Sequence, residues 1–138
     1  MHTTDQCRLH AARLVPGQDL RAELEKLTAA RLIRAGFVLS AVGSLTKVAL
    51  RLANQKVAHT MEGHFEIVSL TGTLGPDGMH IHLSVSDEKG VTTGGHLLEG
   101  CLVYTTVELV VGDAVGLIFH REIDPRTTFP ELSVQRAQ

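Results

Sequence analysis

From Phe37 onward, apolar and polar residues alternate along the chain. A period of two is typical of strands with one buried face. The runs are short, rich in Val, Ile, Leu and Thr, and separated by turns that contain glycine. With a similar run near the N-terminus, they predict strands at 6–15, 37–43, 47–53, 64–74, 79–86, 101–111 and 115–122.

One segment near the N-terminus has helical spacing instead. Leu20, Leu24 and Leu27 lie three and four residues apart, and Asp19 stands where a helix N-cap belongs. Gly36 is of the residue type that often follows a helix, so we predict a helix at about 19–35. One helix followed by a run of strands indicates the α+β class, a mainly antiparallel sheet with one principal helix packed on a face.

Three segments are expected to depart from regular strands. Gly43-Ser44 predicts a turn, the glycine-rich stretch 94–100 predicts a loop with a short turn of helix, and the chain is expected to fray from about residue 125. The chain has 138 residues, the usual size of one domain, so 1–138 is expected to fold as a single domain.

The predicted strand 101–111 is apolar on both sides of its pleat in places. A strand of this kind is buried on both faces. A small domain with one helix covers only one face, so we predict that another subunit covers the second.

Composition argues against two kinds of nucleic-acid binding. The formal net charge is −2, from 13 Lys and Arg against 15 Asp and Glu, so the domain as a whole lacks a basic footprint. One Tyr, four Phe and no Trp are too few rings, most of them in apolar runs, to form a stacking platform for single strands.

The sequence also bears on location. No run of about 18 apolar residues occurs, as a transmembrane helix requires. The first residues lack the basic start and apolar run of a secretory signal. Cys7 and Cys101 lie far apart and are expected to be reduced thiols. We therefore expect a cytoplasmic protein that has no membrane partner.

The strongest chemical signal lies in three of the eight histidines. His80 and His82 are two apart in a predicted strand, so both leave the same face, about 7 Å apart. His96 follows two glycines, which let the backbone fold back beside that strand. Three imidazoles that converge leave a coordination position open. We predict a divalent metal site at His80, His82 and His96, with zinc as the expected ion.

The alternative is that these histidines form hydrogen bonds within the sheet or across a subunit contact. Asp87, Glu62 and Glu99 are possible partners for the outer ring nitrogens, and His64 is a fourth histidine near the predicted strand. No nucleophile elbow, phosphate loop or dinucleotide fingerprint occurs, and no catalytic residue is assigned.

Five segments, in order, resemble the PPC domain shared by plants and prokaryotes, in its prokaryotic form often labelled DNA-binding. The resemblance covers about residues 8–122, and the segments are Ala41–Leu45, Val48–Arg51, Glu62–Gly72, His80–Asp87 and Gly94–Leu97. It implies a homotrimer of α+β subunits. In plant relatives AT-hooks beside the domain bind DNA, whereas the domain itself mediates trimer formation and partner binding.

This chain departs from the plant form, because it has neither an Arg-Gly-Arg-Pro hook nor the motif Gly-Phe-Arg-Met-Glu-Gln. It is similar to prokaryotic members thought to hold a metal, which the resemblance carries to His80, His82 and His96. The expected function is therefore a small homotrimeric module with a His-lined divalent metal site and a DNA-associated or partner-binding regulatory role.

Two other functions stay open. One is a metal-dependent enzyme, a hydrolase or lyase acting on a small molecule, in which the open position activates water. The other is a trimeric scaffold that binds a small ligand between subunits. DNA binding by the chain itself would require a basic face, formed by Arg8, Arg13, Arg31, Arg34 and Arg51.

Overall fold

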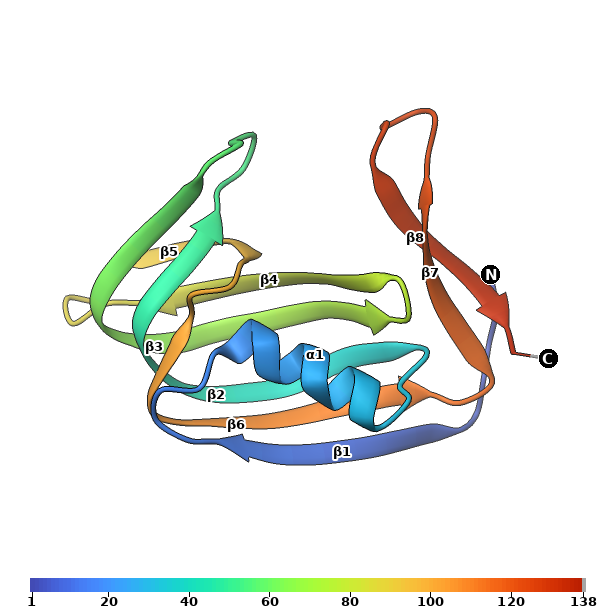
Figure 1. The fold of residues 1–138 in the computed structure, drawn as a ribbon, viewed down its shortest axis with the longest axis horizontal. Coiled ribbons are helices and arrows are strands. Elements are labelled where there is room, and N and C mark those ends of the chain that lie inside the picture. Colours follow the sequence, from blue (N-terminus) through green and yellow to red (C-terminus); the bar gives the residue numbers. More distant parts are fainter. Residues whose placement is uncertain (138) are drawn as a thin grey trace.

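The computed structural model describes residues 1–137 and consists mostly of strands (Figure 1). In chain order the elements are β1 (Cys7–Leu14), α1 (Leu20–Ala30), β2 (Gly36–Arg51), β3 (Ala58–Gly75), β4 (Gly78–Ser86), β5 (Thr92–Leu97), β6 (Leu102–Ala114), β7 (Leu117–Ile123) and β8 (Pro130–Arg136). No helix within 1–137 has the length and apolar character that crossing a membrane requires.

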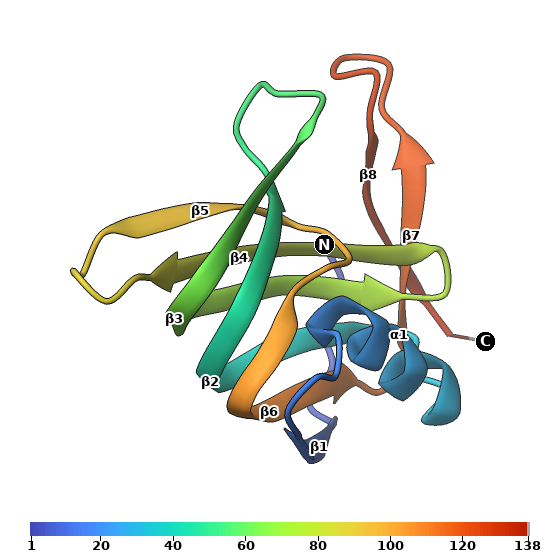
Figure 2. The same cartoon turned by 60° about the vertical axis from the view of Figure 1, so that its left-hand side comes forward.

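Six strands form one sheet in the order β1-β6-β2-β3-β4-β5, and all of its paired strands are antiparallel. The end of β2 also pairs with β5, so the sheet curls back on itself. Helix α1 lies across one face of this sheet, and β7 and β8 form a separate hairpin at its end (Figure 2). The α+β architecture with one principal helix is confirmed.

The helix begins as the sequence predicts. The Asp19 carboxylate accepts hydrogen bonds from the Ala22 N–H at 3.0 Å and from the Gly100 N–H at 2.6 Å. This cap fixes the first turn of α1 and ties it to the start of β6. Leu20 and Leu24 are completely buried and anchor the helix in the core between it and the sheet.

The helix ends five residues earlier than its predicted limit at residue 35, so that limit is wrong. Arg31 is the C-cap, and Leu32 adopts a positive φ of 52° that turns the chain out of the helix. The turn buries Ile33 in the core. Gly36 starts β2, where a Cβ atom would lie 2.7 Å from Ile33 Cγ2. Its glycine therefore reflects close packing and not a helix stop.

The predicted strands 37–43 and 47–53 form one strand, β2, with a register shift between Leu45 and Lys47. Gly43 is not in a turn. It has a φ of +153°, and a Cβ atom there would lie 2.1 Å from the Thr106 carbonyl oxygen. The glycine allows β6 to approach β2.

Two further expectations are wrong. The glycine-rich stretch contains strand β5, because Gly95 lets this strand lie against β2: a Cβ atom there would be 2.6 Å from the Arg51 carbonyl oxygen. The chain also stays regular beyond residue 125, since Pro130–Arg136 form β8 and pair with β7. The alternation of apolar and polar residues did not predict β8, because this strand depends on its pairing with β7.

Candidate metal centre

The three predicted histidines lie together at the end of the sheet that β4 and β5 form. His82 of β4 is the direct register partner of His96 of β5. His80 lies two residues before His82 and so projects from the same face. The antiparallel β4–β5 pair therefore brings the third histidine beside the first two.

The ligand atoms that the three rings offer all lie within 4.8 Å of one another. The Nε2 atoms of His80 and His82 are 3.1 Å apart, and the ring centres of His82 and His96 are 4.5 Å apart. Two nitrogens bound to one tetrahedral zinc ion lie about 3.3 Å apart, given Zn–N bonds of about 2.0–2.1 Å. Small side-chain rotations thus suffice for the cluster to fit such an ion, and its role as a metal-ligand set stays a prediction.

The surroundings of His80 and His96 favour the neutral form of these two imidazoles. Partial burial lowers the pKa of His80 below 6.5, and the nearby charges of Arg121 and His82 lower it further, whereas Glu131 raises it. Burial also lowers the pKa of His96, and Arg51 adds to this effect. A neutral ring keeps the lone pair that a metal ligand needs.

The hairpin β7–β8 supplies the other wall of the site. Arg121 of β7 donates from Nη2 to the Thr73 hydroxyl at 2.6 Å, and Thr73 is the register partner of His80. Together they enclose a shallow pocket of about 290 Å³, lined by Thr71, Gly72, Thr73, His80, His82, Arg121, Glu131 and Leu132.

Sequence reasoning missed Arg121 and Glu131. Arg121 lies in the last predicted strand, 115–122, and Glu131 lies in the segment expected to fray. No spacing relates either residue to His80 or His82. Their approach depends on how β7 meets the β3–β4 turn. There Asp77 Oδ2 accepts from the Arg121 N–H at 3.1 Å and lies 2.7 Å from His120 Nδ1.

The suggested carboxylate partners lie elsewhere. Asp87 caps the β4–β5 turn by accepting from the N–H groups of Lys89 and Val91. His64 instead contacts Glu88 at 3.1 Å. In the part of the chain that the structure describes, no hydrogen bond connects Asp87, Glu62 or Glu99 to the three histidines.

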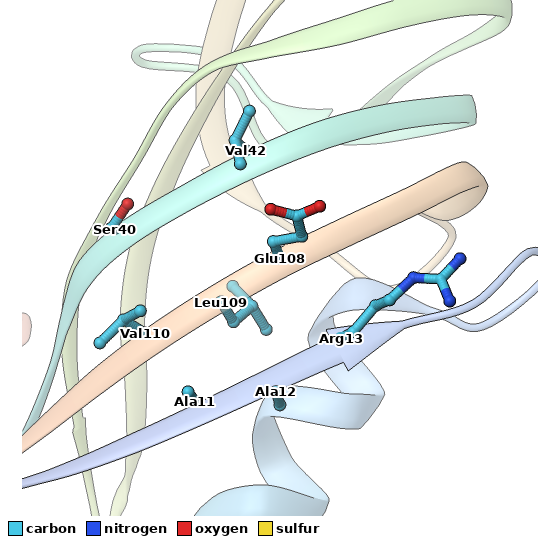
Figure 3. Close-up of a pocket in the computed structure, with 8 residues that line it drawn as sticks. All are labelled: Ala11, Ala12, Arg13, Ser40, Val42, Glu108, Leu109 and Val110. Carbon is cyan, nitrogen blue, oxygen red and sulfur yellow. The ribbon is translucent and has the colours of Figure 1, made fainter.

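A second hollow is formed by residues of strands β1, β2 and β6 (Figure 3). It measures about 390 Å³ and is lined by Ala11, Ala12, Arg13, Ser40, Val42, Glu108, Leu109 and Val110. Strands β1, β6 and β2 form its floor. It contains no cluster of nitrogen or sulfur ligands, so the histidine cluster is the better candidate for chemistry.

Comparison with known proteins places the chain among several relatives. It is 50% identical over 128 residues to "Bifunctional protein GlmU" of Synechococcus sp. (strain JA-2-3B'a(2-13)); the match covers 93% of this chain and 20% of that protein. The chain thus spans about a fifth of the length of the curated relatives it matches.

Solved structures share the fold. A hypothetical protein of Salmonella cholerae-suis is 40% identical, with a TM-score of 0.97 and complete coverage of both chains. A metal-containing protein of Archaeoglobus fulgidus is 23% identical, with a TM-score of 0.82 and coverage of 96% and 99%. A Bacteroides thetaiotaomicron protein described as a "putative dna binding protein" is 19% identical, with a TM-score of 0.80 and coverage of 95% and 98%.

Residues 1–115 match the family described as the Plants and Prokaryotes Conserved (PCC) domain. This is the plant and prokaryotic family that the ordered segments resemble, and the match spans most of the chain. By this match, the chain belongs to the PCC domain family.

Proposed function

We propose that this PCC-domain protein holds a divalent metal ion, with zinc as the expected ion, on His80, His82 and His96. One observation carries the proposal: three imidazoles from two paired strands offer nitrogens that all lie within 4.8 Å of one another. Three such ligands leave a tetrahedral ion with one open position, from which it polarises a ligand or lowers the pKa of a bound water. The likeness to the metal-containing Archaeoglobus fulgidus protein supports this proposal.

The metal content of the purified protein tests this proposal. We expect about one zinc ion per chain by elemental analysis, and loss of the ion in the double variant H80A/H82A. His59→Ala is a matched control, because His59 is an exposed histidine on β3 outside the cluster. A wild-type protein without stoichiometric metal after incubation with zinc, or a double variant that retains it, would contradict the proposal.

The proposed assembly is a homotrimer. The sheet face opposite helix α1 leaves apolar side chains in solvent, including Leu9 and Val42, which are 60% and 56% exposed. An apolar patch of this kind marks an interaction surface. Light scattering is expected to give three times the chain mass, and Val42→Glu is expected to lower it. A wild-type monomer would contradict this assembly.

The proposed biological role is that of a regulatory module that associates with DNA or a protein partner. The Bacteroides thetaiotaomicron neighbour supports the DNA arm. The match to about a fifth of a longer bifunctional protein supports the partner arm, because there the domain is one part of a larger chain.

The arginines of the chain do not all lie on one side. Arg8 and Arg13 are five residues apart in β1 and therefore project from opposite faces. Arg8 lies 3.8 Å from Asp113, and Arg13 donates to the Thr106 hydroxyl. Duplex DNA binding, if direct, is expected to weaken steeply with added salt. If the protein does not bind duplex DNA even at low salt, only the proposed role with a protein partner remains.

A second candidate function is a metal-dependent enzyme, a hydrolase or lyase. The observation that favours it is the pocket beside the cluster, where Arg121 and Glu131 provide charged groups next to His80 and His82. Assays of the metal-loaded protein with a panel of small ester, phosphate and hydroxy-acid substrates test it. No measurable turnover of any substrate with zinc, manganese, nickel or iron bound would contradict this second function.

A further inference from the structure

Arg121 has more hydrogen-bonding capacity than the chain uses. A guanidinium group carries five N–H donors, and within residues 1–137 one of its nitrogens, Nη2, donates to the Thr73 hydroxyl at 2.6 Å. In that same part of the chain, Arg121 forms no ion pair with a carboxylate within 4.0 Å. The remaining donors form a planar fork suited to a carboxylate or phosphate group.

Hydrogen bonds hold both the backbone and the side chain of Arg121 in place. Its backbone N–H donates to Asp77 Oδ2 at 3.1 Å, and its side chain is held by Thr73. Since Thr73 is the register partner of His80, this places the guanidinium beside the histidine cluster, and the two residues line one pocket with His82. Partial burial lowers the pKa of Arg121, so its charge is incompletely solvated and favours an anionic partner.

The charges around the histidine cluster also favour an anionic ligand. Three neutral imidazoles add no negative charge, so a divalent ion held by them keeps its full charge. Arg121 and Arg51 both lie close enough to lower the pKa of His80, and Glu131 is the acidic group that acts in the opposite direction. The pocket, about 290 Å³ in volume, therefore has a strong excess of positive charge once an ion is bound.

We propose that the centre takes a ligand with an oxyanion group, a carboxylate or a phosphate, that occupies the open metal position while Arg121 binds its other oxygen. This inference rests on the proposed metal site. Arg121 and Glu131 lie outside residues 1–115, the part matched to the family. The hairpin β7–β8 thus determines which ligand this chain accepts, whereas β4 and β5 hold the ion.

The test uses the cobalt(II)-loaded full chain, whose visible spectrum reports both the ion and any ligand added to it. Titration with inorganic phosphate and, separately, with acetate is expected to shift the spectrum and give saturable binding. Arg121→Gln is expected to weaken the tighter of the two anions about tenfold or more, since it removes a charge-assisted hydrogen bond. The comparison of phosphate with acetate identifies the preferred oxyanion.

Arg126→Gln is the matched control. Arg126 lies in the connection between β7 and β8 and pairs with Asp124, outside the pocket. It is expected to leave cobalt and anion binding unchanged. Arg121→Lys keeps the cation without the fork and is expected to bind the anion with intermediate affinity. This second variant and a thermal unfolding curve separate loss of the ligand contact from loss of the fold.

The two proposals fail in different ways. A wild-type chain with no cobalt spectrum would overturn the metal site and this inference with it. A normal cobalt spectrum with equal anion affinity in Arg121→Gln and Arg126→Gln would overturn this inference alone. A spectrum that neither phosphate nor acetate changes, in a chain that binds cobalt, would overturn it as well.

Discussion

The two walls of the histidine pocket differ in chemistry. The β4–β5 wall presents the imidazoles of His80, His82 and His96, and burial lowers the pKa values of His80 and His96. The β7–β8 wall presents the opposite charges of Arg121 and Glu131. The first wall suits an ion, and the second suits a ligand that approaches the ion. On the two proposals above, ion binding and ligand choice depend on separate elements, so mutations on each wall are expected to change one without the other.

The largest expected effect comes from removing a donor on the β4–β5 wall. His96→Ala leaves two imidazoles, so zinc affinity is expected to fall by at least about 100-fold, beyond the range found for outer-shell changes. Competition with a chelator of known affinity measures it, with His59→Ala as the control. Equal zinc affinities in the two variants would contradict the prediction, because His96 would then not be a zinc ligand.

A change in backbone packing is expected to act on the same wall more weakly. Gly95→Ala places a Cβ atom 2.6 Å from the Arg51 carbonyl oxygen, so β5 must shift away from β2 and carry His96 with it. Zinc affinity is expected to fall about tenfold, in the range seen when a ligand loses its orientation. Thr93→Ala, on the same strand, is the control. Unchanged zinc affinity in Gly95→Ala would show that the ion tolerates displacement of β5.

The contrast also explains how much of the site the sequence could predict. His80 and His82 share a face by simple alternation, and the glycines before His96 indicated a close approach of the backbone. These are local properties. The position of Arg121 depends on Asp77, which is 44 residues away in the chain, and no local pattern encodes such a contact.

The same distinction holds for the fold. Asp19 and the leucines of α1 predicted where the helix begins, because capping and helical spacing are local properties. The early helix end depends on the burial of Ile33, and the continuity of β2 through Gly43 depends on β6. Glycines were therefore the least reliable signals, since close packing and turns both favour them and the sequence does not distinguish the two.

A smaller effect is expected on the second wall. Glu131→Gln removes the carboxylate that opposes the charge of Arg121. Binding of inorganic phosphate to the cobalt-loaded chain is expected to tighten about threefold, the size of a partly exposed charge interaction. Zinc affinity is expected to change little, because Glu131 is not among the grouped ligand residues. Weaker phosphate binding would instead mean that Glu131 itself contacts the ligand.

The smallest expected effect comes from Asp77, whose carboxylate contacts His120 and the Arg121 N–H and so holds β7 against the β3–β4 turn. Hydrogen bonds from His120 and the Arg121 N–H lower the pKa of Asp77 below 3.8. A carboxyl group with a lower pKa in the folded state binds fewer protons there than in the unfolded state, so its stabilisation is present above 3.8 and is lost as the pH falls through the folded-state value. Asp77→Asn lacks this charge at every pH. Urea midpoints of the wild type and Asp77→Asn are therefore expected to differ slightly at neutral pH and to converge under acid conditions. A difference that stays constant from neutral pH to well below 3.8 would show that Asp77 acts through shape alone, and the ligand wall would then be held without its charge.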